Sequence, residues 1–285
     1  MCLICELKPH LKGMKKNVSY RSAEFLYALN KRKKDFFTLK EAVEILSGKD
    51  YSTIRKLLSD MTRRGLIMRI KDGLYHRIPY EQQPDQYFPN WHLTAEAIAQ
   101  PKEYYIGFYS ALDIHGLITQ PSMIEQVVTW ERVKPKIQKV KNVRFEFITL
   151  SKNRFFGYKK YWINDFQKVN CSVLEKTFLD CLFKPDYAGG VTEITRSLYK
   201  SRDKLQPVKF QEYLGNFNTQ TVYKRLGFII NQLGLFQELQ VFIAGKISSS
   251  YTPLDPSLDK HGNYSSKWRI IDNIDFKTVL DSIKT

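Results

Sequence analysis

Side chains that could bind nucleic acid gather in one stretch of the sequence, residues 51–77. Arginine and lysine can contact guanine edges or phosphates, and hydroxyl groups can bond to either. Five such residues fall near the start of a predicted helix and are expected to face the major groove: Tyr51, Ser52, Thr53, Arg55 and Lys56. The other candidates are the polar Ser59, the expected phosphate contacts Arg63 and Arg64, and three residues expected to reach the flanking backbone or minor groove, Lys71, Tyr75 and Arg77.

Two predicted helices must position these side chains. Thr38 and Glu41 have the S/T-x-x-E spacing of a capping box, which predicts a helix starting at Thr38 with Ala42, Val43 and Leu46 toward the core. Residues 47–50 break that helix, and Asp50 or Ser52 can cap the next one. The second helix carries one apolar stripe, formed by Ile54, Leu57, Leu58 and Met61. It ends at Gly65.

A β-hairpin follows the second helix. Residues 66–70 and 74–78 are strand-prone, and Asp72-Gly73 between them is a strong hairpin signal. An amphipathic helix over residues 22–29 comes first. This order predicts a winged helix-turn-helix domain at residues 18–80. The alternative, an ordinary helical hairpin within a core, does not account for the hairpin directly after a basic helix.

The charge distribution indicates a polyanionic partner. The chain has a net charge of +16 and a pI near 9.5, and residues 1–80 hold 18 Lys/Arg against 8 Asp/Glu. Residues 31–34 are all basic and are expected to contact phosphates or to end a solvated helix. No run of 18 apolar residues and no signal peptide is present, so we expect a cytoplasmic protein that does not bind membranes.

The remaining chain predicts a second, larger domain. A Pro- and Gln-rich linker is expected at residues 81–92, and an α+β domain at 93–285. The patterns predict a helix at 104–117 with His115 at its end, strands at 125–130, 143–150, 155–163 and 166–169, helices at 172–182, 191–201, 208–214, 221–233 and 236–247, a strand at 265–271 and a short final helix. Strands in succession followed by helices favour the α+β class for the chain.

We assign no catalytic residue, cofactor or metal from the sequence. Glu175 and Asp180 lie five residues apart on a predicted helix and so do not share a face. Cys2-x-x-Cys5 with His10 is a conceivable zinc site, but no second pair at metal-ligand spacing exists. Two alternatives stay open: a metal-dependent nuclease using Asp186, and a ligand-sensing regulator with a deep apolar pocket in the second domain.

Four motifs in order resemble the AbiEi-type antitoxins of bacterial and archaeal abortive-infection, type IV toxin–antitoxin systems. They are the segment GLIMRIKDGLYHRIP, then YYIGFYSALDIHGL, VLEKTFLDCLFKP and YKRLGFIINQLG, within residues 20–235. The resemblance implies an autorepressor that binds double-stranded DNA at inverted repeats in its own promoter. It also implies that the C-terminal domain opposes a nucleotidyltransferase-like toxin without a stable complex. The segment after Gly234 is less similar to the family, and no catalytic residue is carried over.

Overall fold

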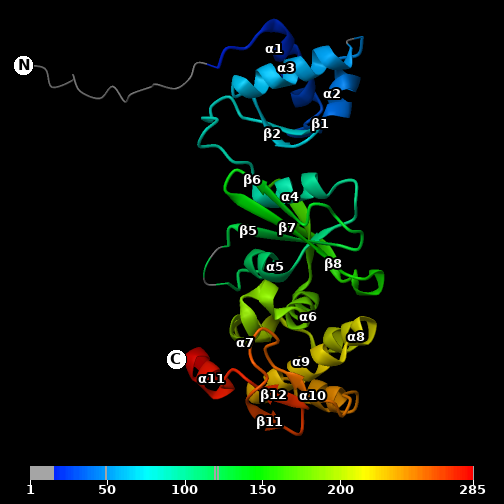
Figure 1. The fold of residues 1–285 in the computed structure, drawn as a ribbon, viewed down its shortest axis with the longest axis vertical. Coiled ribbons are helices and arrows are strands. Elements are labelled where there is room, and N and C mark those ends of the chain that lie inside the picture. The colour runs from blue at the N-terminus through cyan, green and yellow to red at the C-terminus, as the bar shows by residue number, and fades with distance from the viewer. Residues whose placement is uncertain (1–15, 49, 119, 121, 285) are drawn as a thin grey trace, which may run out of the picture. The chain divides into compact units, whose positions relative to one another are not determined.

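The computed structural model describes residues 16–284 except 49, 119 and 121, so Cys2, Cys5 and His10 lie outside the described residues. The chain divides into two compact units between Ile98 and Ala99. Both combine helices with sheets, and the α+β class expected from the sequence is confirmed (Figure 1). No helix in the described part of the chain has the length and apolar character needed to cross a bilayer.

The N-terminal unit contains helices on a three-stranded antiparallel sheet. The sheet order is β1-β3-β2, so the short first strand pairs with the second strand of the hairpin. This arrangement is compatible with a winged helix. The elements are α1 (Tyr20–Lys31), β1 (Phe36–Thr38), α2 (Leu39–Ile45), α3 (Tyr51–Arg63), β2 (Ile67–Lys71), β3 (Leu74–Arg77) and α4 (Trp91–Ala99), whose last residue falls beyond the division.

Local capping rules place α2 and α3 as predicted. The Thr38 side chain accepts from the Glu41 backbone N–H, and the Glu41 carboxylate accepts from the Thr38 N–H, which completes the capping box. The Asp50 carboxylate accepts from the Thr53 N–H and caps α3. Gly65 ends α3 with φ +67°, and a Cβ there would lie 2.2 Å from Pro84 Cγ. A side chain at Gly65 is therefore excluded by backbone conformation and by space.

The core of this unit fixes the orientation of α3. Ile54, Leu58 and Met61 are fully buried, together with Phe25 of α1 and Phe37 of β1, whose rings meet edge to face with centroids 5.2 Å apart. Phe37 also stacks on Tyr75 of β3. Because the stripe of α3 faces this core, the opposite side of the helix faces solvent.

The C-terminal unit is built on a mixed six-stranded sheet and the helices that follow it. The strand order is β6-β7-β5-β4-β9-β8, with parallel pairing in β5/β7 and β4/β9. The strands of this sheet and the elements between them are β4 (Tyr105–Ile106), α5 (Phe108–Ile114), β5 (Ile124–Thr129), β6 (Ile137–Val140), β7 (Val143–Thr149), the 3₁₀ turn Lys152–Arg154, β8 (Tyr158–Trp162) and β9 (Lys168–Ser172).

Helices and a small second sheet complete this unit. The small sheet has the order β10-β12-β11. The elements are α6 (Leu174–Phe183), the 3₁₀ turn Pro185–Ala188, α7 (Gly190–Lys200), the 3₁₀ turn Arg202–Lys204, α8 (Pro207–Phe217), α9 (Gln220–Gln232), α10 (Gln237–Ala244), β10 (Thr252–Pro253), β11 (Asn263–Ser265), β12 (Ile270–Asp272) and α11 (Phe276–Lys284).

Three sequence predictions for this unit are wrong in detail. The predicted helix 104–117 is two elements, because Tyr105 and Ile106 pair with β5 and β9 before α5 begins. The predicted strand 265–271 is two strands joined by a turn. The predicted strand 155–163 begins only at Tyr158. In each case pairing between strands decides where the strand begins and ends, and apolar periodicity does not report that pairing.

Candidate nucleic-acid interface

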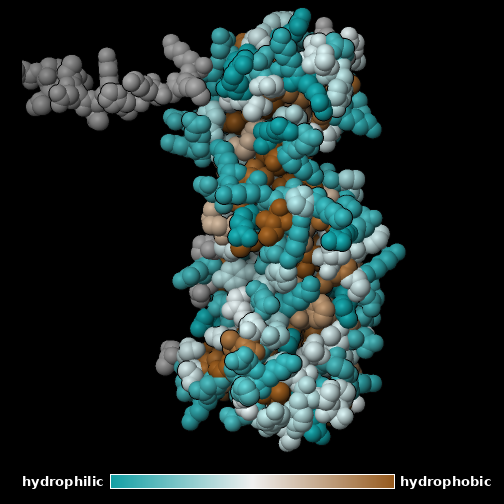
Figure 2. All heavy atoms as spheres, in the orientation of Figure 1, coloured by the Kyte–Doolittle hydropathy of each residue, from teal (hydrophilic) through white to brown (hydrophobic). Residues whose placement is uncertain are grey.

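The solvent-facing side of α3 carries polar and basic residues at helical spacing. Ser52, Lys56, Ser59 and Arg63 follow one another at intervals of three or four residues, and all four are exposed. They lie opposite the buried stripe of α3. The face of the N-terminal unit drawn in Figure 2 is correspondingly largely hydrophilic. A helix presenting such a face has the width that the major groove admits.

A groove of about 470 Å³ separates α3 from the β2–β3 hairpin. Arg55, Ser59, Thr62 and Arg63 line it from the helix, and its other lining residues are Leu39, Arg69, Asp72 and Tyr75. Arg69 and Tyr75 are direct cross-strand partners, so they share one face of the hairpin. Of the predicted residues, the groove therefore brings together Arg55, Ser59, Arg63 and Tyr75.

Arg55 and Lys56 are available for a ligand. The Arg55 guanidinium lies over the Tyr51 ring, with Cζ 5.0 Å from its centroid, and both side chains are exposed. Stacking on a ring orients a guanidinium without using its N–H donors. Neither Arg55 nor Lys56 forms an ion pair or side-chain hydrogen bond with another residue in the described part of the chain. Both can therefore bond to DNA without breaking an existing contact.

Arg63 and Arg69 form ion pairs that a phosphate could replace. Arg63 pairs with Asp60 at 2.6 Å, and Arg69 pairs with Asp72 at 2.6 Å. The arginine side chains are 79% and 57% exposed, and such exposed pairs contribute about 1 kcal/mol or less. Arg69 was absent from the sequence prediction. The alternation of β2 could have identified it, because Met68 and Ile70 on either side are buried.

The hydroxyl groups at the start of α3 already have a partner. Ser52 Oγ donates to one Asp50 carboxylate oxygen, and Thr53 Oγ1 donates to the other at 2.6 Å. These hydrogen bonds, that from Ser52 first, lower the pKa of Asp50, so the cap is ionised at neutral pH. Thr53 also lies on the flank of α3 away from the hairpin. Direct base contacts by Ser52 and Thr53, as predicted, would have to compete with this cap.

Arg64 is held within the N-terminal unit. Its guanidinium donates to the carbonyl oxygens of Asp60 and Asn17 and to Ser22 Oγ, at 3.2, 3.1 and 2.9 Å. The bonds to Asn17 and Ser22 tie the end of α3 to the chain before α1 and to the first turn of α1. The predicted phosphate contact at Arg64 is therefore replaced by a connection between elements, because three of its five N–H groups are occupied.

Two predicted hairpin contacts are likewise engaged elsewhere. Lys71 Nζ donates to the carbonyl of Ile98 at 2.8 Å, and partial burial lowers the pKa of this ammonium group. Arg77 pairs with Asp35 at 2.8 Å and donates to Asn30 Oδ1. Both residues were expected to reach the flanking backbone or minor groove, and in the structure both are only partly exposed and donate to groups within the N-terminal unit. We leave Arg64, Lys71 and Arg77 out of the candidate interface.

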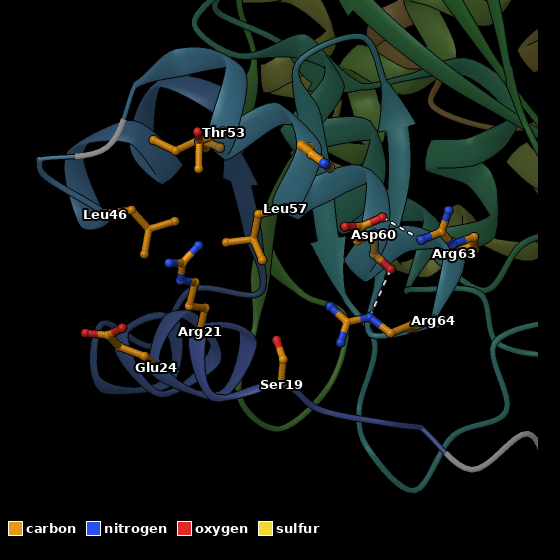
Figure 3. A pocket seen from close by; sticks show the side chains of 11 residues that line it. Ser19, Arg21, Glu24, Leu46, Thr53, Leu57, Asp60, Arg63 and Arg64 are labelled. Carbon is orange, nitrogen blue, oxygen red and sulfur yellow. Dashed lines mark hydrogen bonds and ion pairs between the residues drawn. The ribbon is translucent and has the colours of Figure 1, made fainter.

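The other flank of α3 borders a pocket of about 650 Å³ (Figure 3). Arg21 of α1 extends into it toward Leu46 and Leu57, and Arg64 closes one end. Its lining is mixed, with Glu24 and Asp60 beside the cations. A ligand-sensing regulator was expected to have its pocket in the second domain, whereas this one lies in the N-terminal unit. Arg21 was not predicted as a site residue.

Glu175 and Asp186, the carboxylates weighed for catalysis and for the nuclease alternative, differ in burial. Glu175 is buried and its Oε1 accepts from the backbone N–H of Gln206 at 2.9 Å, so it connects α6 to the start of α8. Asp186 is exposed in the turn after α6. Among the residues that the structure describes, no three His, Cys, Asp or Glu side chains gather as a metal site would require.

The fold is similar to that in the crystal structure of the RV2827C protein from Mycobacterium tuberculosis. The two superpose with a TM-score of 0.71 over 96% of this chain and 98% of that chain, at 11% sequence identity. At this identity the likeness concerns the fold alone. No model of a known protein family matches the sequence, and no curated protein matches it either.

Proposed function

We propose that this protein is a cytoplasmic DNA-binding transcriptional repressor and the antitoxin of a type IV abortive-infection system. In this proposal it represses its own promoter through inverted repeats and counters a nucleotidyltransferase-like toxin. The observation that carries the DNA-binding part is the groove beside α3. Arg55, Arg63 and Arg69 line it, and only one acidic residue, Asp72, does so with them.

The geometry suggests distinct roles for these cations. With α3 in the major groove, Arg55 on the flank next to the hairpin would present its fork to the O6 and N7 atoms of guanine. Lys56 and Arg63 on the outer face would contact phosphates, and Arg69 would contact the adjacent backbone from the hairpin. The exposed Tyr51, which supports Arg55, would fix the direction of that guanidinium.

The antitoxin part rests on the resemblance and on where its motifs lie. The three motifs of the C-terminal unit fall on β4–α5, α6 and α9, and α6 packs against both α5 and α9. They therefore form one connected part of the core, as expected if the chain shares the family's C-terminal fold. Most of their apolar residues are buried, so these motifs support a shared scaffold and assign no contact to a toxin.

A binding experiment with the full chain tests the DNA-binding part. Arg55→Ala/Lys56→Ala should weaken binding to a fragment of the protein's own promoter by roughly tenfold or more, since one guanine contact alone contributes about 1–3 kcal/mol. The matched control, Lys246→Ala/Lys260→Ala, removes the same charge from exposed positions of the C-terminal unit and should change binding little. Equally weakened binding by both variants would refute a specific role for α3.

The same preparations distinguish the repressor from the nuclease alternative. With magnesium or manganese present, the DNA should be shifted in a gel and remain intact. Cleavage that Asp186→Asn abolishes would make the nuclease the better explanation.

The antitoxin part has its own test. Co-expression should restore growth to cells that produce the nucleotidyltransferase-like toxin of the proposed system. Arg55→Ala/Lys56→Ala should still restore growth, because its substitutions leave the C-terminal unit intact. Failure of the wild-type chain to restore growth would refute the antitoxin proposal without affecting the DNA-binding one.

A further inference from the structure

The end of the β8–β9 hairpin combines exposed aromatic rings with lysines. β8 lies at one edge of the six-stranded sheet (Figure 1) and pairs with β9 in antiparallel register, with Trp162 opposite Lys168 and Lys160 opposite Asn170. Directly opposite residues share a face, so Lys160, Trp162 and Lys168 lie together on one side of the hairpin. All three are exposed.

The aromatic side chains here have little cover. Trp162 is 61% exposed, and Phe166 in the connecting turn is 89% exposed. The Lys168 ammonium lies 4.1 Å from the centre of the Trp162 ring, which is cation–π distance. One face of the indole therefore already meets a cation, and the residue as a whole is still 61% exposed.

The charge of the hairpin defines the chemistry of a partner. Lys159, Lys160 and Lys168 are exposed between Tyr158 and Ser172, against one acidic residue, Asp165. A purely apolar partner would have to cover these ammonium groups at a desolvation cost. A nucleotide offers both a flat ring and a negative phosphate, and duplex DNA hides its ring faces in the stack, whereas a single strand exposes them.

We propose that the end of the β8–β9 hairpin binds single-stranded nucleic acid. Trp162 and Phe166 stack on successive bases, while Lys160 and Lys168 contact the phosphates between or beside them. When a base stacks on Trp162, Lys168 either stays on the opposite face of the indole or moves to a phosphate. This site is separate from α3 and does not depend on the function proposed for the N-terminal unit.

Edge protection is the competing explanation for the lysines. Lysine on an edge strand discourages pairing with another sheet, and β8 is an edge strand. That explanation accounts for Lys159 and Lys160. It does not account for Phe166, which lies in the turn beyond the paired residues and adds exposed apolar surface.

Tryptophan fluorescence and binding together test the proposal in the full chain. The background carries Arg55→Ala/Lys56→Ala, so that contacts through α3 are weakened, and the probes are twelve-nucleotide oligo-dT and oligo-U. Either probe should quench the fluorescence, and a preference for one identifies DNA or RNA as the ligand. Trp162→Ala should abolish most of the quenching and weaken binding roughly five- to 150-fold, the effect typical of removing one stacked base.

Further variants separate stacking from charge. Trp162→Phe keeps an aromatic ring, so binding should stay within a few fold of the parent while the quenching disappears. Phe166→Ala should weaken binding like Trp162→Ala. Lys160→Ala/Lys168→Ala should flatten the slope of log K against log salt by about 0.7 for each phosphate that the protein no longer neutralises.

An exposed aromatic residue outside the hairpin serves as the control. Tyr264→Ala removes an aromatic ring that is 65% exposed elsewhere in the same unit and should leave binding unchanged. Unchanged binding by Trp162→Ala and Phe166→Ala would overturn the proposal, as would weaker binding confined to the lysine variants. If the aromatic variants instead fail only in restoring growth against the toxin, the hairpin contacts a protein and the nucleic-acid proposal is wrong.

Discussion

The cations on the outer face of α3 and the buried cations of the C-terminal unit differ in whether their N–H donors are free. On α3 of the N-terminal unit, Arg55 and Lys56 are exposed and form no ion pair within the described residues. In the C-terminal unit, Lys176, Lys224 and Arg225 are at most 3% exposed and donate to fixed acceptors. A net charge of +16 therefore says little by itself about where a polyanion would bind, because a cation that is buried and bound to fixed acceptors cannot contact it.

The buried cations of the C-terminal unit connect distant segments. Lys224 Nζ donates to Ser248 Oγ and to the carbonyl of Ser250, and Arg225 donates to the carbonyls of Leu182 and Pro253. Burial lowers the pKa of Arg225 to about 10, which still leaves it charged at neutral pH. These residues hold α9 to the chain on either side. Replacing them should therefore lower the free energy of unfolding more than it changes the affinity for a partner.

The largest expected effect concerns Lys176. It is fully buried, and its ammonium donates to Asp180 at 2.5 Å and to the Tyr105 hydroxyl at 2.8 Å, with Tyr105 donating to the other Asp180 oxygen. Burial lowers the pKa of Lys176 and raises that of Asp180. Lys176→Met leaves the carboxylate without its cation and should reduce the free energy of unfolding by about 3–5 kcal/mol, measured by urea denaturation.

A triple variant shows whether charge or packing causes that destabilisation. Lys176→Met/Asp180→Leu/Tyr105→Phe removes every polar side chain of the network. It should recover at least half of the unfolding free energy that Lys176→Met loses. Equal destabilisation in the two would mean that the shape of the lysine side chain matters and its charge does not.

The next largest effect is a pH dependence in the N-terminal unit. His76 is 4% exposed, and burial lowers its pKa to about 4, with Asp35 opposing and Arg77 assisting the shift. Because the folded pKa is below the ordinary value of 6.5, folding favours the neutral ring. Its contribution is complete above pH 6.5 and is lost as pH falls toward 4, at most roughly 3 kcal/mol.

A non-titrating variant isolates this contribution. His76→Gln can still hydrogen-bond with the Tyr87 hydroxyl, and its unfolding free energy should fall less between pH 7 and pH 4 than that of the wild type. His261→Gln, at an exposed position, should follow the wild-type curve. Identical curves for wild type and His76→Gln would show that carboxylates alone cause the acid sensitivity.

Local rules explain which parts of the fold could be predicted. The cap at Thr38, the stripe of α3 and the end at Gly65 each depend on neighbours within a few residues, and all three are confirmed. The strands β1 and β6 were missed, because segments of three and four residues acquire their structure from pairing with β3 and β7.

For the candidate interface too, the residues that could be predicted are those whose environment depends on near neighbours in the sequence. Exposure of Arg55 and Lys56 follows from helical geometry, so the sequence identifies them. The partners of Arg64 and Lys71 lie 47 and 27 residues away, at Asn17 and Ile98, and no local pattern reports such contacts. Sequence reasoning therefore finds cations on the correct element but cannot tell which of them are already bound.

A smaller effect separates base contacts from phosphate contacts at Arg55. Arg55→Lys keeps the charge but removes the planar fork, so it should reduce binding to the promoter fragment by about 1–3 kcal/mol and binding to random DNA much less. Competition titrations with both DNAs measure the two changes in affinity. If both affinities fall in the same ratio, Arg55 contacts phosphate, and α3 lies in the groove with a different face toward the bases.

The smallest effect compares two lysines in the same unit. Lys56 is exposed on the outer face of α3, whereas Lys71 donates to the Ile98 carbonyl. Lys56→Ala should flatten the slope of log K against log salt by about 0.9, the value for one phosphate contact on duplex DNA. Lys71→Ala should leave the slope unchanged and lower only the free energy of unfolding, by about 1 kcal/mol for one hydrogen bond. Titrations with random-sequence DNA at several salt concentrations give both slopes without any knowledge of the operator. A flatter slope for Lys71→Ala would mean that its ammonium leaves the Ile98 carbonyl to bind phosphate, and Lys71 would then belong to the interface as the sequence first indicated.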